Sequence, residues 1–239
     1  MPLHPNRPLV LGHRGAPFQV PENTMRGFRL AMAQGADGVE LDVQPAADGA
    51  PVVIHDLSLD RTTGRTGVVA ALSWPAIAEA RAGGEPVPRL EEAAAWAAES
   101  GAWVNVEIKS PGAEAASVAA MEAAGVMGRT VFSSFVPEVI AELGRVAPHA
   151  LRYFLTERWD DVVRRRVQDL GVHGVCPHHS IATPALLGEL REAGLGVVVW
   201  TVDDPERIRE LVRAGVDAVI TNRPELGVAV LAEEHRKSN

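Results

Sequence analysis

Short apolar runs rich in valine and isoleucine recur along the chain, separated by segments rich in alanine, leucine and arginine. Most of these runs are continuous rather than alternating with polar residues, which is typical of strands buried on both faces. The predicted strands are Pro8–Gly12, Gly38–Val43, Trp103–Ile108, Thr130–Ser133, Leu151–Leu155, Gly174–Pro177, Gly196–Thr201 and Ala218–Thr221.

The segments between these runs have helix-forming composition. The predicted helices are Thr24–Gln34, Leu90–Glu99, Ala113–Ala124, Pro137–Val146, Asp160–Leu170, Pro184–Ala193, Pro205–Ala214 and Leu226–Glu234. Several are followed by glycine, as helix C-termini often are, at Gly35, Gly101, Gly125, Gly171, Gly194 and Gly215. Eight strand–helix units in 239 residues predict an α/β fold of the TIM (β/α)8 barrel type. A doubly wound open sheet uses the same units and is the alternative.

One segment breaks this alternation. After the second strand, the hairpin signal Asp48-Gly49 leads into another strand-like run, Pro51–His55, which we expect to return over the barrel mouth. The following residues, 56–89, lack a clear helix until near their end. We therefore predict a single domain over residues 1–239, with residues 56–89 as an insertion that forms a lid over the barrel mouth.

Composition narrows the classes of partner. The chain is 46% hydrophobic and 23% charged, with a net charge of −8 and no basic cluster, which argues against a nucleic-acid partner. The N-terminal apolar run is too short for a signal peptide, and no run approaches the length of a membrane span. The sole cysteine, Cys176, lies in an apolar run and is interpreted as a small buried hydrophobic residue. The absence of disulfides favours a cytoplasmic location, while the oligomeric state has no signal in the sequence.

Acidic residues gather where two predicted strands end, and barrel active sites are built at the C-terminal ends of strands. Glu40 and Asp42 are two residues apart, as are Glu107 and Lys109, so each pair leaves one face of its strand. If that face is the barrel lumen, three carboxylates and an ammonium group converge. A ligand set made only of oxygen favours one hard divalent cation, Mg²⁺ or Ca²⁺ with Mn²⁺ possible, over zinc.

The alternative is a charged barrel layer without a metal, in which Lys109 pairs with Glu107 or Asp42. The charge balance favours the metal site. A divalent cation and three carboxylates leave one negative charge, and Arg14 and Lys109 bring the site to one positive charge. This charge matches a phosphodiester, which carries one negative charge and is suited to both cations.

Two histidines also lie at predicted strand ends, His13 next to Arg14 and His55 next to Asp56. Cleavage of a phosphodiester needs a base for the attacking hydroxyl and an acid for the leaving alkoxide. Two histidines that titrate near neutral pH can divide these roles. A single histidine at a strand end is more often structural, but two beside charged residues predict an acid–base pair.

A series of motifs follows the same order as the strands. It consists of His13-Arg14-Gly15, Pro21-Glu22-Asn23-Thr24, Glu40-Leu41-Asp42-Val43, His55-Asp56, Leu59-Asp60-Arg61-Thr62-Thr63, Glu107-Ile108-Lys109, Trp200-Thr201-Val202 and Thr221-Asn222-Arg223-Pro224. Each motif alone is weak, but together, over nearly the whole chain, they resemble the signature series of the glycerophosphodiester phosphodiesterase family, in its bacterial cytoplasmic type.

The resemblance implies a TIM barrel with a small insertion after the second strand. It also implies metal-dependent hydrolysis of glycerophosphodiesters to glycerol 3-phosphate and an alcohol. The implied metal ligands are Glu40, Asp42 and Glu107, the implied acid–base pair is His13 and His55, and Arg14 and Lys109 would hold the phosphate.

Other matched positions have weaker interpretations. Capping of the first helix is a sufficient account of Asn23 and Thr24. Glu22 could be an outer ligand or bind a second metal. Trp200 could wall the glycerol end of the pocket, although core packing explains it equally well. Phe18 and Phe135 could line the mouth.

Two other functions compete with this hypothesis. A phospholipase D-like or lysophospholipase D-like enzyme would act on acylated lipids, but it would need an apolar rim, and aromatic residues make up only 5% of the chain. A non-catalytic barrel would bind a phosphorylated metabolite without converting it. The intact set of two histidines and three carboxylates argues against this last alternative.

Overall fold

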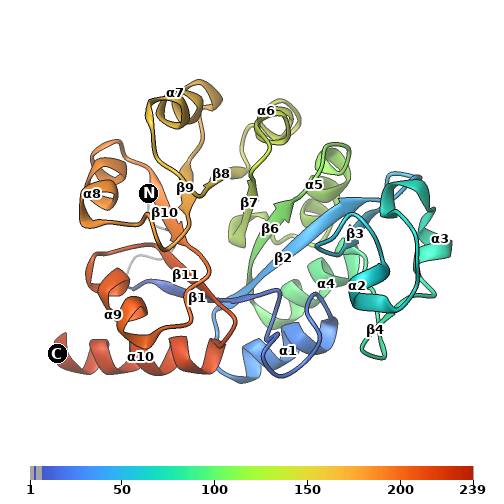
Figure 1. The fold of residues 1–239 in the computed structure, drawn as a ribbon, viewed down its shortest axis with the longest axis horizontal. Helices are drawn as coiled ribbons and strands as arrows, with labels where there is room; N and C mark the ends of the chain where they lie inside the picture. The colour runs from blue at the N-terminus through green and yellow to red at the C-terminus, as the bar shows by residue number, and fades with distance from the viewer. Residues whose placement is uncertain (1–2, 4–6, 239) are drawn as a thin grey trace.

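The computed structural model, which describes residues 3 and 7–238, contains a closed barrel of parallel strands (Figure 1). The barrel strands are β1 (Leu9–His13), β2 (Gly38–Pro45), β6 (Trp103–Ile108), β7 (Thr130–Ser134), β8 (Leu151–Thr156), β9 (Gly174–Pro177), β10 (Gly196–Val199) and β11 (Ala218–Thr221). Their order around the barrel follows the chain, and β1 pairs with both β2 and β11. This closure confirms the TIM barrel and excludes the doubly wound sheet.

Helices surround the barrel on its outer side (Figure 1). They are α1 (Met25–Ala33), α4 (Leu90–Ser100), α5 (Glu114–Ala123), α6 (Pro137–Val146), α7 (Asp161–Leu170), α8 (Pro184–Glu192), α9 (Pro205–Arg213) and α10 (Pro224–Ser238), with a 3-10 turn, η2 (Met127–Arg129), before β7. All six glycines predicted at helix ends adopt a positive φ. Within the described part of the chain, no helix combines the length and the apolar character needed to cross a membrane.

The two faces of the strands explain why the apolar runs are continuous. On β1, Val10 packs outward against the helices, whereas Leu9 and Leu11 belong to a separate inner cluster that fills the barrel. Tyr153 and Cys176 belong to the same inner cluster, and Cys176 is fully buried, as expected for a small hydrophobic residue. Because this apolar layer fills part of the lumen, inward-facing polar residues gather in another layer.

An insertion follows the second strand, as predicted. The strand β3 (Pro51–Val53) pairs antiparallel with β2 and ends two residues before the predicted His55. It is followed by α2 (Asp60–Thr63), η1 (Val69–Ala71), α3 (Trp74–Ile77), β4 (Arg81–Ala82) and β5 (Glu85–Pro86). Residues of this segment, among them Leu59 and Ile77, form a small hydrophobic cluster together with Val52 of β3. Figure 1 shows α2, α3 and β4 beside β3, near the end of β2. The role of residues 56–89 as a lid stays a prediction.

Candidate active site

The register of the barrel brings the three predicted carboxylates together. In the pairing of β2 with β6, Asp42 lies beside Glu107, and Glu40 lies two residues earlier on the same face of β2. One oxygen atom of each side chain lies within 4.8 Å of the others. The residues are almost completely buried, with exposed fractions of 3% for Glu40, 0% for Asp42 and 9% for Glu107. Three acidic groups therefore share one small volume away from water.

This cluster fits a cation better than it fits a charged layer without one. Lys109 does pair with the acids, at 2.6 Å from Glu107 and 3.6 Å from Asp42. Yet Oε1 of Glu40 and Oδ1 of Asp42 are buried and have no hydrogen-bond partner among the described residues. Burial, followed by the charge of Asp42, raises the pKa of both Glu40 and Glu107. Buried carboxylate oxygens without a hydrogen bond, such as Oε1 of Glu40 and Oδ1 of Asp42, the latter 3.6 Å from Lys109, are the ligands that a hard divalent cation prefers.

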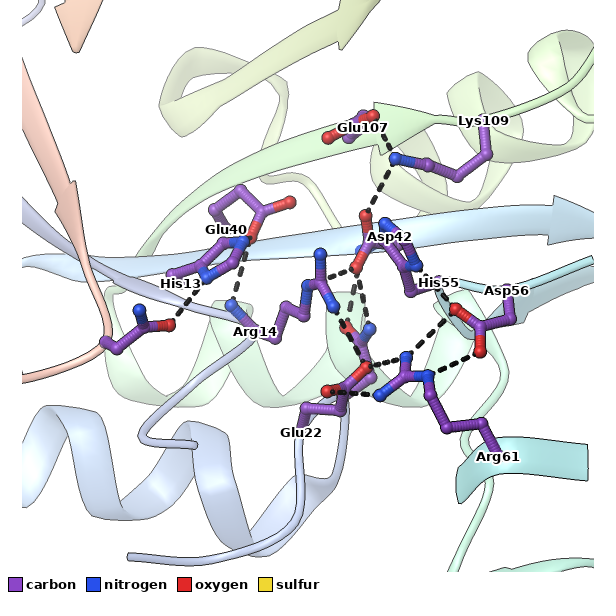
Figure 2. Close-up of polar contacts among 12 residues, drawn as sticks. His13, Arg14, Glu22, Glu40, Asp42, His55, Asp56, Arg61, Glu107 and Lys109 are labelled. Carbon is purple, nitrogen blue, oxygen red and sulfur yellow. Dashed lines mark hydrogen bonds and ion pairs between the residues drawn. The ribbon is translucent and has the colours of Figure 1, made fainter. Parts of the chain in front are cut away.

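Arg14 reaches the cluster from an unusual backbone conformation. Its φ is 51°, a left-handed value that is rare for a residue other than glycine. In this conformation its backbone N–H donates to Oε2 of Glu40 at 2.9 Å. The guanidinium lies 3.0 Å from Asp42 and 3.0 Å from Glu22 (Figure 2). Burial opposes the charge, but the surrounding carboxylates outweigh it and raise the pKa of Arg14. The guanidinium of Arg14 therefore stays positively charged beside the three acids.

A chain of hydrogen bonds fixes the tautomer of His13. The amide Nδ2 of Asn222 donates to Asp203 at 2.7 Å, so Oδ1 of Asn222 must accept. This oxygen lies 2.7 Å from Nδ1 of His13, which therefore carries the proton. The other ring nitrogen, Nε2, lies 3.9 Å from Glu40. Burial first, and the charge of Arg14 second, lower the pKa of His13 and favour its neutral form. Because Nδ1 carries the proton, Nε2 of this neutral ring is unprotonated.

His55 is held on the opposite side of the cluster. Its Nδ1 lies 2.7 Å from Oδ1 of Asp56, and its backbone carbonyl accepts a hydrogen bond of 3.0 Å from Gln44. Hydrogen bonds from Arg61, more than any other contact, lower the pKa of Asp56 and keep this carboxylate ionised. Figure 2 shows His13 and His55 on either side of Arg14 and the acids. In both histidines, Nδ1 is engaged by a neighbouring oxygen.

Three residues of the Pro21–Thr24 motif have different roles. Thr24 caps α1 by accepting the N–H of Gly27 at 3.1 Å, as predicted. The capping interpretation is wrong for Asn23, whose side chain donates to Oδ2 of Asp42 at 2.8 Å. A left-handed φ of 54° turns Asn23 toward the barrel. Glu22 forms ion pairs with Arg14 and Arg61.

The three predicted pocket aromatics do not form one group. Trp200 and Phe135 make an edge-to-face contact with ring centroids 5.3 Å apart, and the ammonium of Lys109 lies 5.8 Å from the ring of Phe135. Trp200 also packs on the inner cluster and donates to the carbonyl of Cys176, so core packing accounts for part of its environment. Phe18 is 67% exposed and has Arg223 over its ring at 5.4 Å.

Gln44, Asp203 and Arg61 are among the residues of the site that had no role assigned from the sequence. Gln44 continues the two-residue spacing of Glu40 and Asp42, a signal that could have placed it in the lumen. Asp203 follows a matched motif closely but carries no spacing signal of its own. Arg61 belongs to a matched motif, yet its partners lie 39 and 5 residues away in the chain. Only the folded structure reveals the contacts of the last two.

Comparison with known proteins identifies the family. A family model described as the glycerophosphoryl diester phosphodiesterase family matches residues 13–226, a range that contains the acidic cluster, both cations and both histidines. The chain belongs to this family. The resemblance inferred from the motifs is therefore confirmed, and with it the enzyme class, a phosphoric diester hydrolase.

Three similar proteins align with this chain over nearly their full length. A glycerophosphodiester phosphodiesterase of Caldanaerobacter subterraneus is 36% identical over 235 residues, which cover 91% of this chain and 95% of the relative. The crystal structure of a glycerophosphodiester phosphodiesterase from Agrobacterium tumefaciens is 32% identical, with a TM-score of 0.82 and coverage of 93% and 99% of the two chains. An Oleispira antarctica phosphodiesterase, solved with the product sn-glycerol-3-phosphate, is 27% identical, with a TM-score of 0.85 and coverage of 95% and 97%.

Proposed function

We propose that this chain hydrolyses glycerophosphodiesters to glycerol 3-phosphate and an alcohol, with a divalent cation held by Glu40, Asp42 and Glu107. The observation that carries the proposal is the buried cluster of three carboxylates, in which two oxygens lack a hydrogen-bond partner in the described part of the chain. The Oleispira antarctica relative was solved with glycerol 3-phosphate, which supports the same product here. The alcohol would be choline, ethanolamine or glycerol.

Arg14 and Lys109 are suited to bind the phosphate. Both side chains lie against the acidic cluster and are only 17% and 18% exposed, so their charges are poorly screened by water. The planar fork of Arg14 fits two phosphate oxygens, while Lys109 supplies a point charge. When bound, a divalent cation (Mg²⁺, Ca²⁺ or Mn²⁺) would polarise the phosphate ester and stabilise the charge that develops during cleavage.

His13 and His55 would move the protons. Asn222 engages Nδ1 of His13 and Asp56 engages Nδ1 of His55, so each ring is oriented and can exchange a proton through Nε2. One imidazole would deprotonate the attacking hydroxyl and the other would protonate the leaving alkoxide. Trp200 and Phe135, which pack edge to face, would form the apolar wall of the pocket, and Phe18 would line its outer edge.

A coupled assay tests this function. The chain is expected to release choline from glycerophosphocholine in the presence of Mg²⁺, Ca²⁺ or Mn²⁺ and to lose this activity when a chelator is added. Lysophosphatidylcholine should be a poorer substrate, whereas a lysophospholipase D-like enzyme would prefer it. Binding of glycerophosphocholine without release of choline would indicate a non-catalytic barrel and contradict the proposal.

Thermal unfolding tests the metal site independently of turnover. A cation that binds only the folded state at 100 times its Kd stabilises that state by about 2.7 kcal/mol. For a chain of this length the melting temperature should then rise by about 5–10 °C. The rise should be reversed by a chelator and should be absent with monovalent salt at equal ionic strength. An unchanged melting temperature at saturating Mg²⁺, Ca²⁺ and Mn²⁺ would contradict the assignment.

Three structural expectations belong to the same proposal. We propose that residues 1–239 form one domain and that residues 56–89 act as a lid, because Arg61 of this segment contacts Glu22 and Asp56 at the site. A cytoplasmic location is proposed because the sole cysteine, Cys176, is free and buried, as suits a reducing compartment. Limited proteolysis with and without substrate would report closure of the lid.

A further inference from the structure

We propose that Arg61 is a positioning residue, through which the insertion holds both the phosphate-binding arginine and one of the two histidines in place. The inference rests on the function proposed above. It depends on the position of Arg61 between two carboxylates, each of which holds a different group of the site (Figure 2).

The guanidinium of Arg61 makes two bidentate contacts. On one side, Nη2 and Nη1 donate to Glu22 at 2.7 and 3.1 Å. On the other side, Nε and Nη2 donate to Asp56 at 2.5 and 2.9 Å. A planar fork is needed to satisfy two carboxylates in this way, and a single ammonium group cannot reproduce it.

Each of these two carboxylates also contacts a residue of the proposed active site. Glu22 also accepts a third hydrogen bond, from Nη1 of Arg14 at 3.0 Å, on the side of the acidic cluster. Asp56 lies 2.7 Å from Nδ1 of His55. Arg61 is 51% exposed, whereas Glu22 and Asp56 are only 19% and 26% exposed, so the network runs from the surface into the pocket. An isolated exposed ion pair contributes little, but a bidentate network can hold its members in one geometry.

Arg61 lies on the short helix α2, which is anchored by contacts within the insertion. Leu59, just before α2, is 1% exposed and belongs to the hydrophobic cluster of the insertion. The hydroxyl of Thr63 donates to the carbonyl of Leu59 at 2.7 Å and closes the single turn that presents Arg61. Packing of Leu59 in this cluster, which also contains Val52 of β3, therefore helps to set the position of Arg61.

Loss of Arg61 would change the site in two ways. Glu22 and Asp56 would lose the cation that they share, so two more carboxylates would repel an anionic substrate. Glu22 would then pair with Arg14 alone. This electrostatic effect should raise KM. His55 would also be held by a carboxylate that is itself no longer fixed, and this loss of orientation should lower kcat.

Steady-state kinetics with glycerophosphocholine and saturating Mg²⁺ separate the two effects. Arg61→Ala is expected to lower kcat by about 10–100-fold and to raise KM by about 10-fold, since small misplacements of reacting groups are costly. Arg61→Lys restores the charge but not the fork, so it should recover most of KM and little of kcat. The matched control is Arg65→Ala, because Arg65 lies on the same insertion and is 47% exposed, and its side chain contacts Glu79 at 2.9 Å and the carbonyl of Ala76 at 3.3 Å, both within the insertion.

A double-mutant cycle with Asp56→Asn tests the route. If Arg61 acts on His55 through Asp56, Arg61→Ala should lower kcat much less in the Asp56→Asn background than in the wild type. Equal effects in both backgrounds would exclude this route. Should Arg61→Ala fail to fold, the split between kcat and KM in Arg61→Lys, measured with its melting temperature, decides the question.

The outcomes keep this inference apart from the proposed function. A wild-type chain that releases no choline contradicts the function itself. An active wild type whose Arg61→Ala variant keeps kcat and KM within about twofold, like Arg65→Ala, leaves the function standing and overturns the role of Arg61. A lower melting temperature without any kinetic change would show that Arg61 is only structural, and would also overturn it.

Discussion

Replacement of Glu40 by glutamine is expected to abolish both hydrolysis and its dependence on a divalent cation. The amide keeps the shape of the side chain and an oxygen that can accept the N–H of Arg14, but it removes one of the three buried carboxylates proposed to hold the cation. Loss of several kcal/mol of transition-state stabilisation corresponds to a decrease in kcat/KM of about 10³-fold or more. Titration of activity with Mg²⁺, Ca²⁺ and Mn²⁺ measures both effects.

The thermal stability of the Glu40→Gln variant shows whether a loss of activity comes from loss of the metal or from unfolding. Without metal, this variant should be no less stable than the wild type, because one of three mutually repelling groups is gone. It should also lose the rise in melting temperature that the wild type shows with metal. Wild-type turnover by Glu40→Gln, retained after chelation, would show that the three carboxylates do not hold a catalytic metal.

Replacement of either active-site histidine by alanine is expected to lower kcat by about 10²–10⁴-fold, the usual contribution of one general acid or base. The wild-type enzyme should show a bell-shaped pH–rate profile, and each of His13→Ala and His55→Ala should remove one limb or nearly all activity. The measurement is kcat/KM across a pH series at constant ionic strength.

His149→Ala is the matched control for these two variants. His149 is 61% exposed and pairs with Glu122 at 3.2 Å, outside the acidic cluster. Its replacement should leave the pH–rate profile unchanged. If His13→Ala and His55→Ala also keep the wild-type profile, neither imidazole carries a proton in the reaction.

The fold could be read from the sequence because its signal is local. Buried strands of a barrel are apolar on both faces, so the runs were visible without knowledge of their partners, and all eight predicted barrel strands agree with the structure to within two residues at either end. The insertion was harder to predict. Its helices α2 and α3 have four residues each, too few for a helical period to appear in the sequence.

The same distinction holds for the site residues: some could be predicted from local spacing, and others depend on contacts between distant parts of the chain. A spacing of two residues placed Glu40 and Asp42 on one strand face, and this rule needs no tertiary structure. Their neighbours could not be found in this way. Asn23 reaches Asp42 only because its backbone adopts a left-handed φ, which a capping interpretation does not anticipate. Asn222 lies 209 residues from His13 in the chain, so their contact exists only once the barrel closes.

The closed order of the strands has a consequence for how related enzymes can diverge. The acids of the cluster, Arg14 and Lys109 come from three adjacent strands, β1, β2 and β6, and the residues just after them. Phe135 and Trp200 instead follow β7 and β10, on the remaining arc of the barrel. A change in the wall of the pocket can therefore be confined to that arc while the acids and the two cationic side chains stay in place, so that the same reactive groups are kept through repeated changes of substrate.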